Sequence, residues 1–270
     1  MTGDPSGSDM NILEVRDLSV SFNAASGPVK AVDGINFEIK KNEVFGIVGE
    51  SGSGKTVTAL SILRLVDRPG RITAGKVIFD GKDLLGIDEE RMRHIRGARI
   101  SMVFQEPSSS LDPVFTAGYQ IEEAALAHEK ISASAAKDAA IEFLQMVHIK
   151  DPMKVYSSYP HQLSGGTKQR VSIAMALINS PELVIMDEPT TALDVTIQSG
   201  ILDLISEIVD LKKISVLFIS HDLGVINRMC RRVAVMRRGK IVESGDKDVI
   251  LKNPSNSYTM SLLASARALS

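Results

Sequence analysis

Short apolar runs alternate along the chain with longer segments in which apolar residues recur at helical spacing. The runs that predict strands are Ile12–Phe22, Ile35–Ile39, Val44–Val48, Lys76–Phe79, Arg99–Phe104, Leu183–Met186, Ser215–Ile219 and Val233–Met236. The segments that predict helices are Lys55–Leu65, Ser132–Val147, Thr167–Ile178, Val195–Leu211 and Leu223–Met229. Buried strands followed by helices indicate an α/β core with a largely parallel sheet.

Two parts of the chain depart from this alternation. Residues up to about 80 hold several strand patterns with few helices between them, which favours an antiparallel β subdomain beside the core. The stretch from about 108 to 164 is rich in Ala and Glu and has helical spacing, so we expect an inserted α-helical subdomain. Residues 1–10 are rich in Gly, Ser and Asp, and we expect a flexible N-terminal tail there rather than a signal peptide.

Composition narrows the class of protein. The 270 residues include 31 Lys plus Arg and 33 Asp plus Glu, a net charge of −2 that argues against a basic nucleic-acid-binding surface. With 4% aromatic residues and no Trp, a base-stacking platform is not expected either. Cys230 is the single cysteine, which excludes an internal disulfide and favours a reducing compartment. Apolar runs stay well short of the roughly 18 residues of a membrane span, so we do not expect the chain to cross a bilayer by itself.

A glycine-rich loop follows the run Val44–Val48 and opens the predicted helix at Lys55. Its sequence, GESGSGKT over residues 49–56, matches the pattern G-x-x-x-x-G-K-[ST]. Glycines let backbone N–H groups approach phosphate oxygens, and the helix N-terminus adds partial positive charge. Lys55 would reach the β- and γ-phosphates, and the Thr56 hydroxyl would bind Mg²⁺. The alternative is a flexible Gly/Ser turn, but the strand before the loop and the helix after it favour nucleotide binding. The expected nucleotide-binding residues of the loop are Gly49, Ser51, Gly52, Ser53, Gly54, Lys55 and Thr56.

A second acidic site ends the run Leu183–Met186. Ligands of parallel sheets bind at the carboxyl ends of strands, where Asp187 and Glu188 would lie. Asp187 would hold Mg²⁺ through water, and Glu188 would polarise an attacking water. Taken alone, the pair could equally be a capping Asp and a solvated Glu. A phosphate loop in the same chain favours the catalytic interpretation.

A further glycine pair precedes the predicted helix Thr167–Ile178. Ser164, Gly165 and Gly166 offer backbone donors at a helix N-terminus, which can contact a phosphate, although in isolation they could be a helix cap followed by a turn. This Leu-Ser-Gly-Gly sequence, about 20 residues before a run ending in Asp-Glu-Pro, resembles the ATP-binding-cassette (ABC) ATPases. The resemblance extends from about residue 11 to 264 and implies a P-loop NTPase core. The remaining family motifs follow in order: Gln105 resembles the Q-loop, Ala192-Leu193-Asp194 the D-loop, His221 the switch histidine, and Phe22 the aromatic residue that stacks on adenine.

The resemblance implies a mechanism. ATP and Mg²⁺ would be bound, with Thr56, Gln105 and Asp187 near the metal ion, Glu188 as the base and His221 on the γ-phosphate. Two cassettes would pack head to tail, so that Ser164 and the two following glycines contact ATP held by the partner. The ATPase domain would cover residues 11–252, with the helical insertion at about 108–164 receiving a membrane subunit and residues 253–270 forming a C-terminal tail.

The similarity is greatest to importers of oligopeptides, dipeptides and nickel, and the Phe-Gln-Glu-Pro phrase at residues 104–107 and the Tyr-Pro-His-Gln phrase at 159–162 carry it. It implies integral membrane permease subunits, an identical or homologous second ATPase and, indirectly, an extracytoplasmic solute-binding protein, with this chain at the cytoplasmic face of the membrane. Thr167-Lys168 stands where this subgroup usually has Met-Arg or Met-Gln, and Asn256-Ser257 where it commonly has His-Pro, which leaves the solute open.

Other functions remain as alternatives to peptide import. They are import of nickel or another solute, a soluble ABC ATPase that acts outside transport, and a nucleotide sensor without turnover. The presence of Glu188 and His221 argues against the sensor. A hydrolase triad at Ser220-His221-Asp222 is not favoured, because adjacent residues cannot align three side chains on one proton path.

Overall fold

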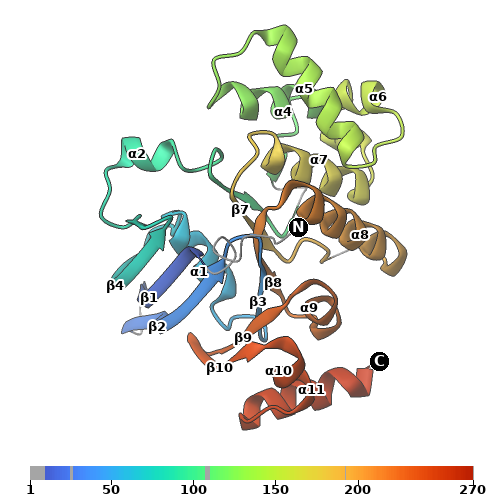
Figure 1. Cartoon of the computed structure of the whole chain (residues 1–270). Helices are drawn as coiled ribbons and strands as arrows, with labels where there is room; N and C mark the ends of the chain where they lie inside the picture. The colour runs from blue at the N-terminus through green and yellow to red at the C-terminus, as the bar shows by residue number, and fades with distance from the viewer. Residues whose placement is uncertain (1–9, 25–26, 107–109, 192, 270) are drawn as a thin grey trace, which may run out of the picture. The chain divides into compact units, whose positions relative to one another are not determined.

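The computed structural model describes residues 10–24, 27–106, 110–191 and 193–269, which fall into two compact units (Figure 1). The first unit contains the described residues up to 88 and those from 215 onward, and the second contains residues 89–214. The expected N-terminal tail, except for Met10, and Ala192 of the D-loop lie outside the described residues.

An antiparallel sheet forms the N-terminal part of the first unit. β1 (Asn11–Ala24) pairs with β2 (Gly27–Lys40) on one side and with β4 (Gly70–Phe79) on the other, and β5 (Lys82–Asp83) continues the order beyond β4. The predicted antiparallel β subdomain is therefore confirmed.

The strand before the glycine-rich loop is central to the other sheet of the first unit. β3 (Val44–Val48) pairs in parallel with β8 (Ser215–Ser220) and with β9 (Arg232–Arg237), while β10 (Lys240–Asp246) runs antiparallel to β9. Nearly all residues of β3 and β8 are buried, as expected of strands covered on both faces. The helices of this unit are α1 (Lys55–Ile62), α9 (Leu223–Met229), α10 (Lys247–Lys252) and α11 (Ser257–Leu269).

The second unit pairs β6 (Ile100–Val103) in parallel with β7 (Leu183–Asp187) and is otherwise helical. Ser132 and Asp194 cap α5 (Ala133–Met146) and α8 (Val195–Lys212) by accepting hydrogen bonds from first-turn amides, which explains where these helices begin. The inserted helical subdomain and the parallel pairing agree with the predicted P-loop NTPase fold. The helices are α2 (Glu89–Arg93), α4 (Ala117–Leu126), α5 (Ala133–Met146), α6 (Pro152–Tyr156), α7 (Gly165–Leu177) and α8 (Val195–Lys212), with a 3-10 turn at Pro160–Gln162.

Several elements differ from the sequence-based expectation. β2 begins at Gly27 instead of Ile35, because its partly exposed first half is held by pairing with β1 and not by an apolar face. β10 was not expected, since it is a partly exposed edge strand that pairing with β9 defines. The segment 253–270, expected as a C-terminal tail, contains α11, whose Tyr258 and Thr259 are buried.

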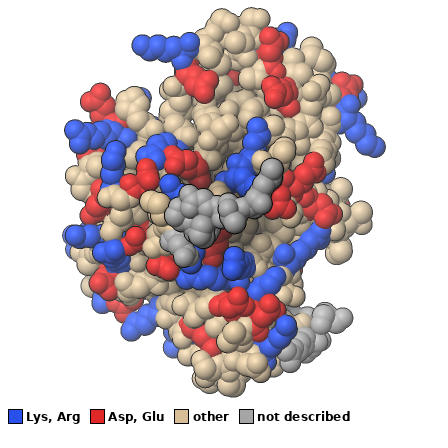
Figure 2. Space-filling view, in the orientation of Figure 1, with Lys and Arg blue, Asp and Glu red and all other residues tan. Residues whose placement is uncertain are grey.

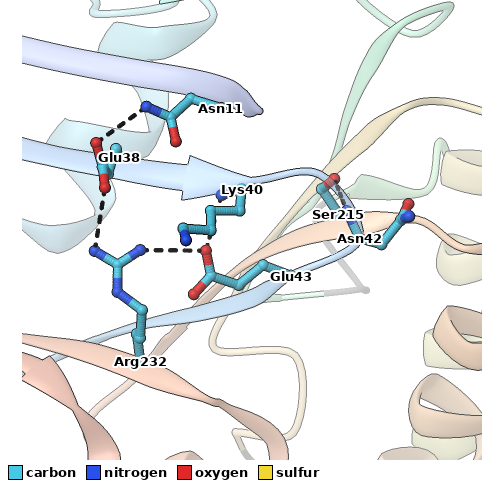
Figure 3. Close-up of polar contacts among 7 residues, drawn as sticks. All are labelled: Asn11, Glu38, Lys40, Asn42, Glu43, Ser215 and Arg232. Carbon is cyan, nitrogen blue, oxygen red and sulfur yellow. Dashed lines mark hydrogen bonds and ion pairs between the residues drawn. The ribbon is translucent and has the colours of Figure 1, made fainter. Parts of the chain in front are cut away.

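A charged cluster joins the two sheets of the first unit (Figure 3). Arg232 on β9 lies 3.7 Å from a carboxylate oxygen of Glu38 on β2 and 3.4 Å from one of Glu43. Glu43 is buried and also accepts the backbone N–H of Lys40 at 2.8 Å. The guanidinium of Arg232 lies 5.5 Å from the ring centroid of Phe45 on β3. Breaking a paired buried charge is costly, so this cluster fixes the turn that leads into β3.

Basic and acidic side chains alternate over the face drawn in Figure 2, in keeping with the near-neutral net charge. Among the described residues, none of the helices combines the length and the apolar character needed to span a bilayer.

Candidate nucleotide-binding site

The glycine-rich loop connects β3 to α1 in the first unit. Gly52 and Gly54 have φ angles of +76° and +108°, which side chains with a Cβ rarely adopt. Gly54 is the N-cap of α1, and no side chain caps the helix. The partial positive charge of the helix dipole favours an anion at this N-terminus.

Two glycines of the loop lie so close to backbone that no side chain fits. A Cβ on Gly49 would lie 2.1 Å from the carbonyl oxygen of Met236 on β9, and one on Gly54 would lie 2.4 Å from that of Ala31 on β2. The carbonyl of Ser53 also accepts the N–H of Gly239 at 2.8 Å. The β9–β10 turn and β2 thus hold the loop against the first unit.

Lys55 folds back onto its own loop. The side chain is 5% exposed, and its Nζ donates to the carbonyl oxygens of Gly49 at 2.8 Å and Glu50 at 3.0 Å. The buried hydroxyl of Ser53 has no hydrogen-bond partner among the described residues. A buried ammonium and an unsatisfied hydroxyl in a loop of backbone donors suit a phosphate group.

Phe22 and His221 belong to the same unit. Phe22 on β1 is half-buried and packs over Gly70, where a Cβ would lie 2.5 Å from its ring. His221 follows β8 and is exposed. Its neighbours act locally: the Ser220 hydroxyl accepts the N–H of Asp222 at 2.9 Å, and Asp222 caps α9. Both hydrogen bonds are made to backbone N–H groups.

The acidic pair lies in the second unit at the end of β7. Asp187 is 1% exposed and Glu188 is 9% exposed. Glu188 accepts hydrogen bonds from Nε2 of Gln105 at 3.1 Å and from the hydroxyl of Thr191 at 2.9 Å, so the structure brings Gln105 and Glu188 together. Two donors on one carboxylate oxygen fix the side chain. Thr191, three residues after Glu188, belongs to no motif that points to this role.

Gly165 and Gly166, the second glycine pair of the sequence analysis, open α7 in the same unit. Ser164 caps this helix by accepting the N–H of Thr167 at 3.3 Å, and Gly165 is exposed. A Cβ on Gly166 would lie 2.7 Å from Ile197, in the first turn of α8. Asp194, the expected D-loop residue, caps α8 and is exposed. An accessible helix N-terminus with glycine donors can bind an anion that approaches from outside.

The fold of the first unit and the geometry of its glycine-rich loop are those of a nucleotide-binding protein of the P-loop type. The sequence profile of the ABC transporter family matches residues 32–191. The chain belongs to the ABC transporter family, and within it to the ATP-binding subunits that hydrolyse ATP.

Curated relatives have similar sequences over most of the chain. The oligopeptide transport ATP-binding protein OppD of Bacillus subtilis (strain 168) is 49% identical over 96% of this chain and 72% of its own length. The dipeptide transport ATP-binding protein DppD of Escherichia coli (strain K12) is 46% identical over 94% of this chain and 78% of its own length.

A solved structure has the same fold. The dimeric ATP-binding cassette MJ0796, bound to ADP and phosphate in a post-hydrolysis state, is 27% identical, with a TM-score of 0.78 over 87% of this chain and 98% of that chain. The ATPase identification and the fold expectation are therefore confirmed.

Proposed function

We propose that this chain is the ATP-hydrolysing subunit of an ABC importer for oligopeptides or dipeptides. The support for this class of solute is the 46–49% identity, over 94–96% of the chain, to proteins named as oligopeptide and dipeptide transport subunits. Import of nickel or another small solute by the same ATPase is the second candidate, because the ATP site itself does not contact the solute.

In this proposal the residues of the first unit bind the nucleotide. The loop residues Gly49 to Thr56 surround the phosphates, and Phe22 supplies the aromatic surface for adenine. Lys55 gives up its contacts to the loop carbonyls in part and turns its ammonium to the β- and γ-phosphates. His221, exposed after β8, binds the γ-phosphate.

The second unit supplies the base. Glu188 accepts a proton from the attacking water, and the donors from Gln105 and Thr191 orient its carboxylate. Mg²⁺, when bound, neutralises phosphate charge. The hydroxyl of Thr56, the amide oxygen of Gln105 and the carboxylate of Asp187 fit this ion, since Mg²⁺ takes oxygen ligands.

Two cassettes form the working ATPase. The support is the accessible N-terminus of α7, where Ser164, Gly165 and Gly166 lie in a unit that has no phosphate loop of its own. These donors contact ATP bound to the loop of a second, identical or homologous chain, and Asp194 lies at the same interface. Because ATP binds the closed dimer better than the separate chains, binding closes the dimer and hydrolysis opens it.

The helical subdomain at about 108–164 contacts integral membrane permease subunits at the cytoplasmic face. It carries exposed large apolar side chains, and the rings of Phe115 and Tyr119 stack at 4.7 Å. Exposed apolar clusters of this kind mark interaction sites. A solute-binding protein acts on the permease from the other side, and nucleic acid is not a partner. The exposed large apolar residues among those described in this subdomain are Val114, Phe115, Tyr119, Leu126, Met153 and Tyr159.

The substitution Glu188→Gln tests the catalytic role. Because the amide cannot accept the proton, we expect ATP binding to persist and turnover to fall by about 10²–10⁴-fold, the usual contribution of a general base. ATP should then hold the variant as a dimer in size-exclusion chromatography.

The matched control is Glu182→Gln, which removes a surface ion pair to Arg99 in the same unit and should keep wild-type turnover. Wild-type turnover in Glu188→Gln would refute the assignment. A protein that stays monomeric with a non-hydrolysable analogue, even with its membrane subunits, would refute the dimer.

Purification from detergent extracts tests the transport role. Co-purification of integral membrane subunits, and loss of peptide uptake in cells that carry Glu188→Gln, is the expected result. Loss of nickel uptake with normal peptide uptake would favour the second candidate. Recovery of ribosomes or DNA without membrane subunits would indicate a non-transport ATPase instead.

A further inference from the structure

The C-terminal helix reaches the phosphate-binding loop within the first unit. Tyr258, in the first turn of α11, is 6% exposed, and its hydroxyl accepts a hydrogen bond from the backbone N–H of Glu50 at 3.4 Å. Glu50 is the second residue of the loop. The partners are separated by 208 positions in the sequence, so the contact results from the tertiary fold alone.

Neighbouring residues hold Tyr258 in place. The guanidinium of Arg237, at the end of β9, lies 4.5 Å from its ring centroid, a cation–π distance. The backbone N–H of Tyr258 donates to the side chain of Asn256 at 2.9 Å. Glu243 on β10 accepts the N–H and the hydroxyl of Ser255 at 2.6 Å and 2.8 Å. These contacts anchor the start of α11 to β9 and β10, close to the turn that supports the loop.

The N–H group that donates to Tyr258 and a carbonyl group that accepts from Lys55 belong to the same peptide group. The peptide between Gly49 and Glu50 presents its carbonyl oxygen to Nζ of Lys55 at 2.8 Å and its N–H to the Tyr258 hydroxyl. A trans peptide is planar with its N–H and C=O on opposite sides. Fixing one end of the group therefore fixes the direction of the other. Burial raises the pKa of Tyr258, so the hydroxyl remains protonated at neutral pH.

We propose that Tyr258 is a positioning residue for the nucleotide: its hydroxyl fixes the Gly49–Glu50 peptide and thereby the ammonium of Lys55. The inference rests on the proposed role of the loop and adds a C-terminal contact that the loop motif does not contain. Without the hydroxyl, the N–H of this peptide group loses its partner, and ATP binding must order the group again at a cost in affinity.

The test is Tyr258→Phe in the full chain, which keeps the ring and its contact with Arg237. Losing one hydrogen bond that orders the loop should raise the Kd for ATP by about 2- to 10-fold. The KM for ATP should rise by the same factor, with kcat at saturating ATP within about twofold, since bound phosphates can themselves order the loop.

Tyr156→Phe is the matched control. It removes a tyrosine hydroxyl that donates to Glu122 in the second unit, and should leave ATP affinity unchanged. In nucleotide-free protein, hydrogen exchange of the loop amides should accelerate in Tyr258→Phe and not in Tyr156→Phe.

A double-mutant cycle separates this proposal from the proposed function. If Tyr258 acts through Lys55, the Phe substitution should have little further effect on ATP affinity in a Lys55→Ala background. A wild-type Kd and unchanged loop exchange in Tyr258→Phe, with weakened binding in Lys55→Ala, would overturn the positioning role alone. Wild-type affinity in Lys55→Ala would instead overturn the assignment of the loop.

Discussion

Replacing Gly49 by alanine places a methyl group 2.1 Å from the carbonyl oxygen of Met236 and 2.9 Å from the hydroxyl of Ser53. A carbon and an oxygen in contact normally lie about 3.3 Å apart, so the loop or β9 must move by about 1.2 Å, the difference from 2.1 Å. The carbonyl of Ser53 is hydrogen-bonded to Gly239, so a shift of the β9–β10 turn would pull on the loop as well.

This displacement has two measurable consequences. Overpacking of this kind costs about 1–3 kcal/mol of unfolding free energy, and at about 2–4 °C per kcal/mol the melting temperature should fall by about 2–12 °C. In a site that depends on aligned donors, a displacement of about 1 Å can lower the activity of the site by about 10²-fold. We expect the Kd for ATP, measured by calorimetry on folded protein, to rise at least about tenfold.

Gly81→Ala is the control. Gly81 lies in an exposed turn with φ +77° and has no atom within 4 Å of an added Cβ, so alanine there adds backbone strain without a clash. It should lower stability by about 1–2 kcal/mol and leave ATP affinity unchanged. Wild-type affinity in Gly49→Ala would refute the close contact between the loop and β9. Equal losses of affinity in both variants would show that destabilisation alone weakens binding.

Two further predictions concern charged groups of the first unit. Lys55→Ala removes the ammonium expected at the β- and γ-phosphates and should weaken ATP binding by about 10- to 100-fold, whereas unchanged affinity in calorimetry would contradict that role. Burial raises the pKa of Glu243, but the hydroxyl of Thr259 and the hydrogen bonds from Ser255 and Asn256 outweigh burial and bring the pKa below its usual value. The stability that Glu243 contributes is therefore present above about pH 4.5, the ordinary glutamate value, and is lost as the pH falls further. Acid unfolding should show a smaller loss below this pH in Glu243→Gln, and identical profiles would contradict the assignment.

Local sequence was sufficient for the two parts of the site that consist of consecutive residues. The loop from Gly49 to Thr56 follows a buried strand and opens a helix, as its spacing predicts. Asp187 ends β7, and Glu188 follows it. In both cases the chemistry and the turn that presents it lie within a few residues, so a window of sequence contains the whole arrangement.

The elements that the sequence did not predict lack a distinctive pattern of apolar residues and are stabilised by contacts with neighbouring elements. β10 has no strong apolar alternation and exists because β9 pairs with it. The first turn of α11 is anchored through Glu243, and few apolar residues mark it as packed. The family resemblance placed Gln105 only near the metal ion, and its contact with Glu188, 83 positions away in the sequence, comes from the tertiary fold.

The sequence by itself determined that this protein binds a nucleotide through a glycine-rich loop and belongs with the ABC ATPases, because motif, strand and helix are contiguous. Only the tertiary structure decided what supports the loop: Met236 against Gly49, and Tyr258 on the N–H of Glu50. Such contacts depend on strand order and on where distant segments cross. No local periodicity encodes them, because each partner takes its position from the packing of the whole unit.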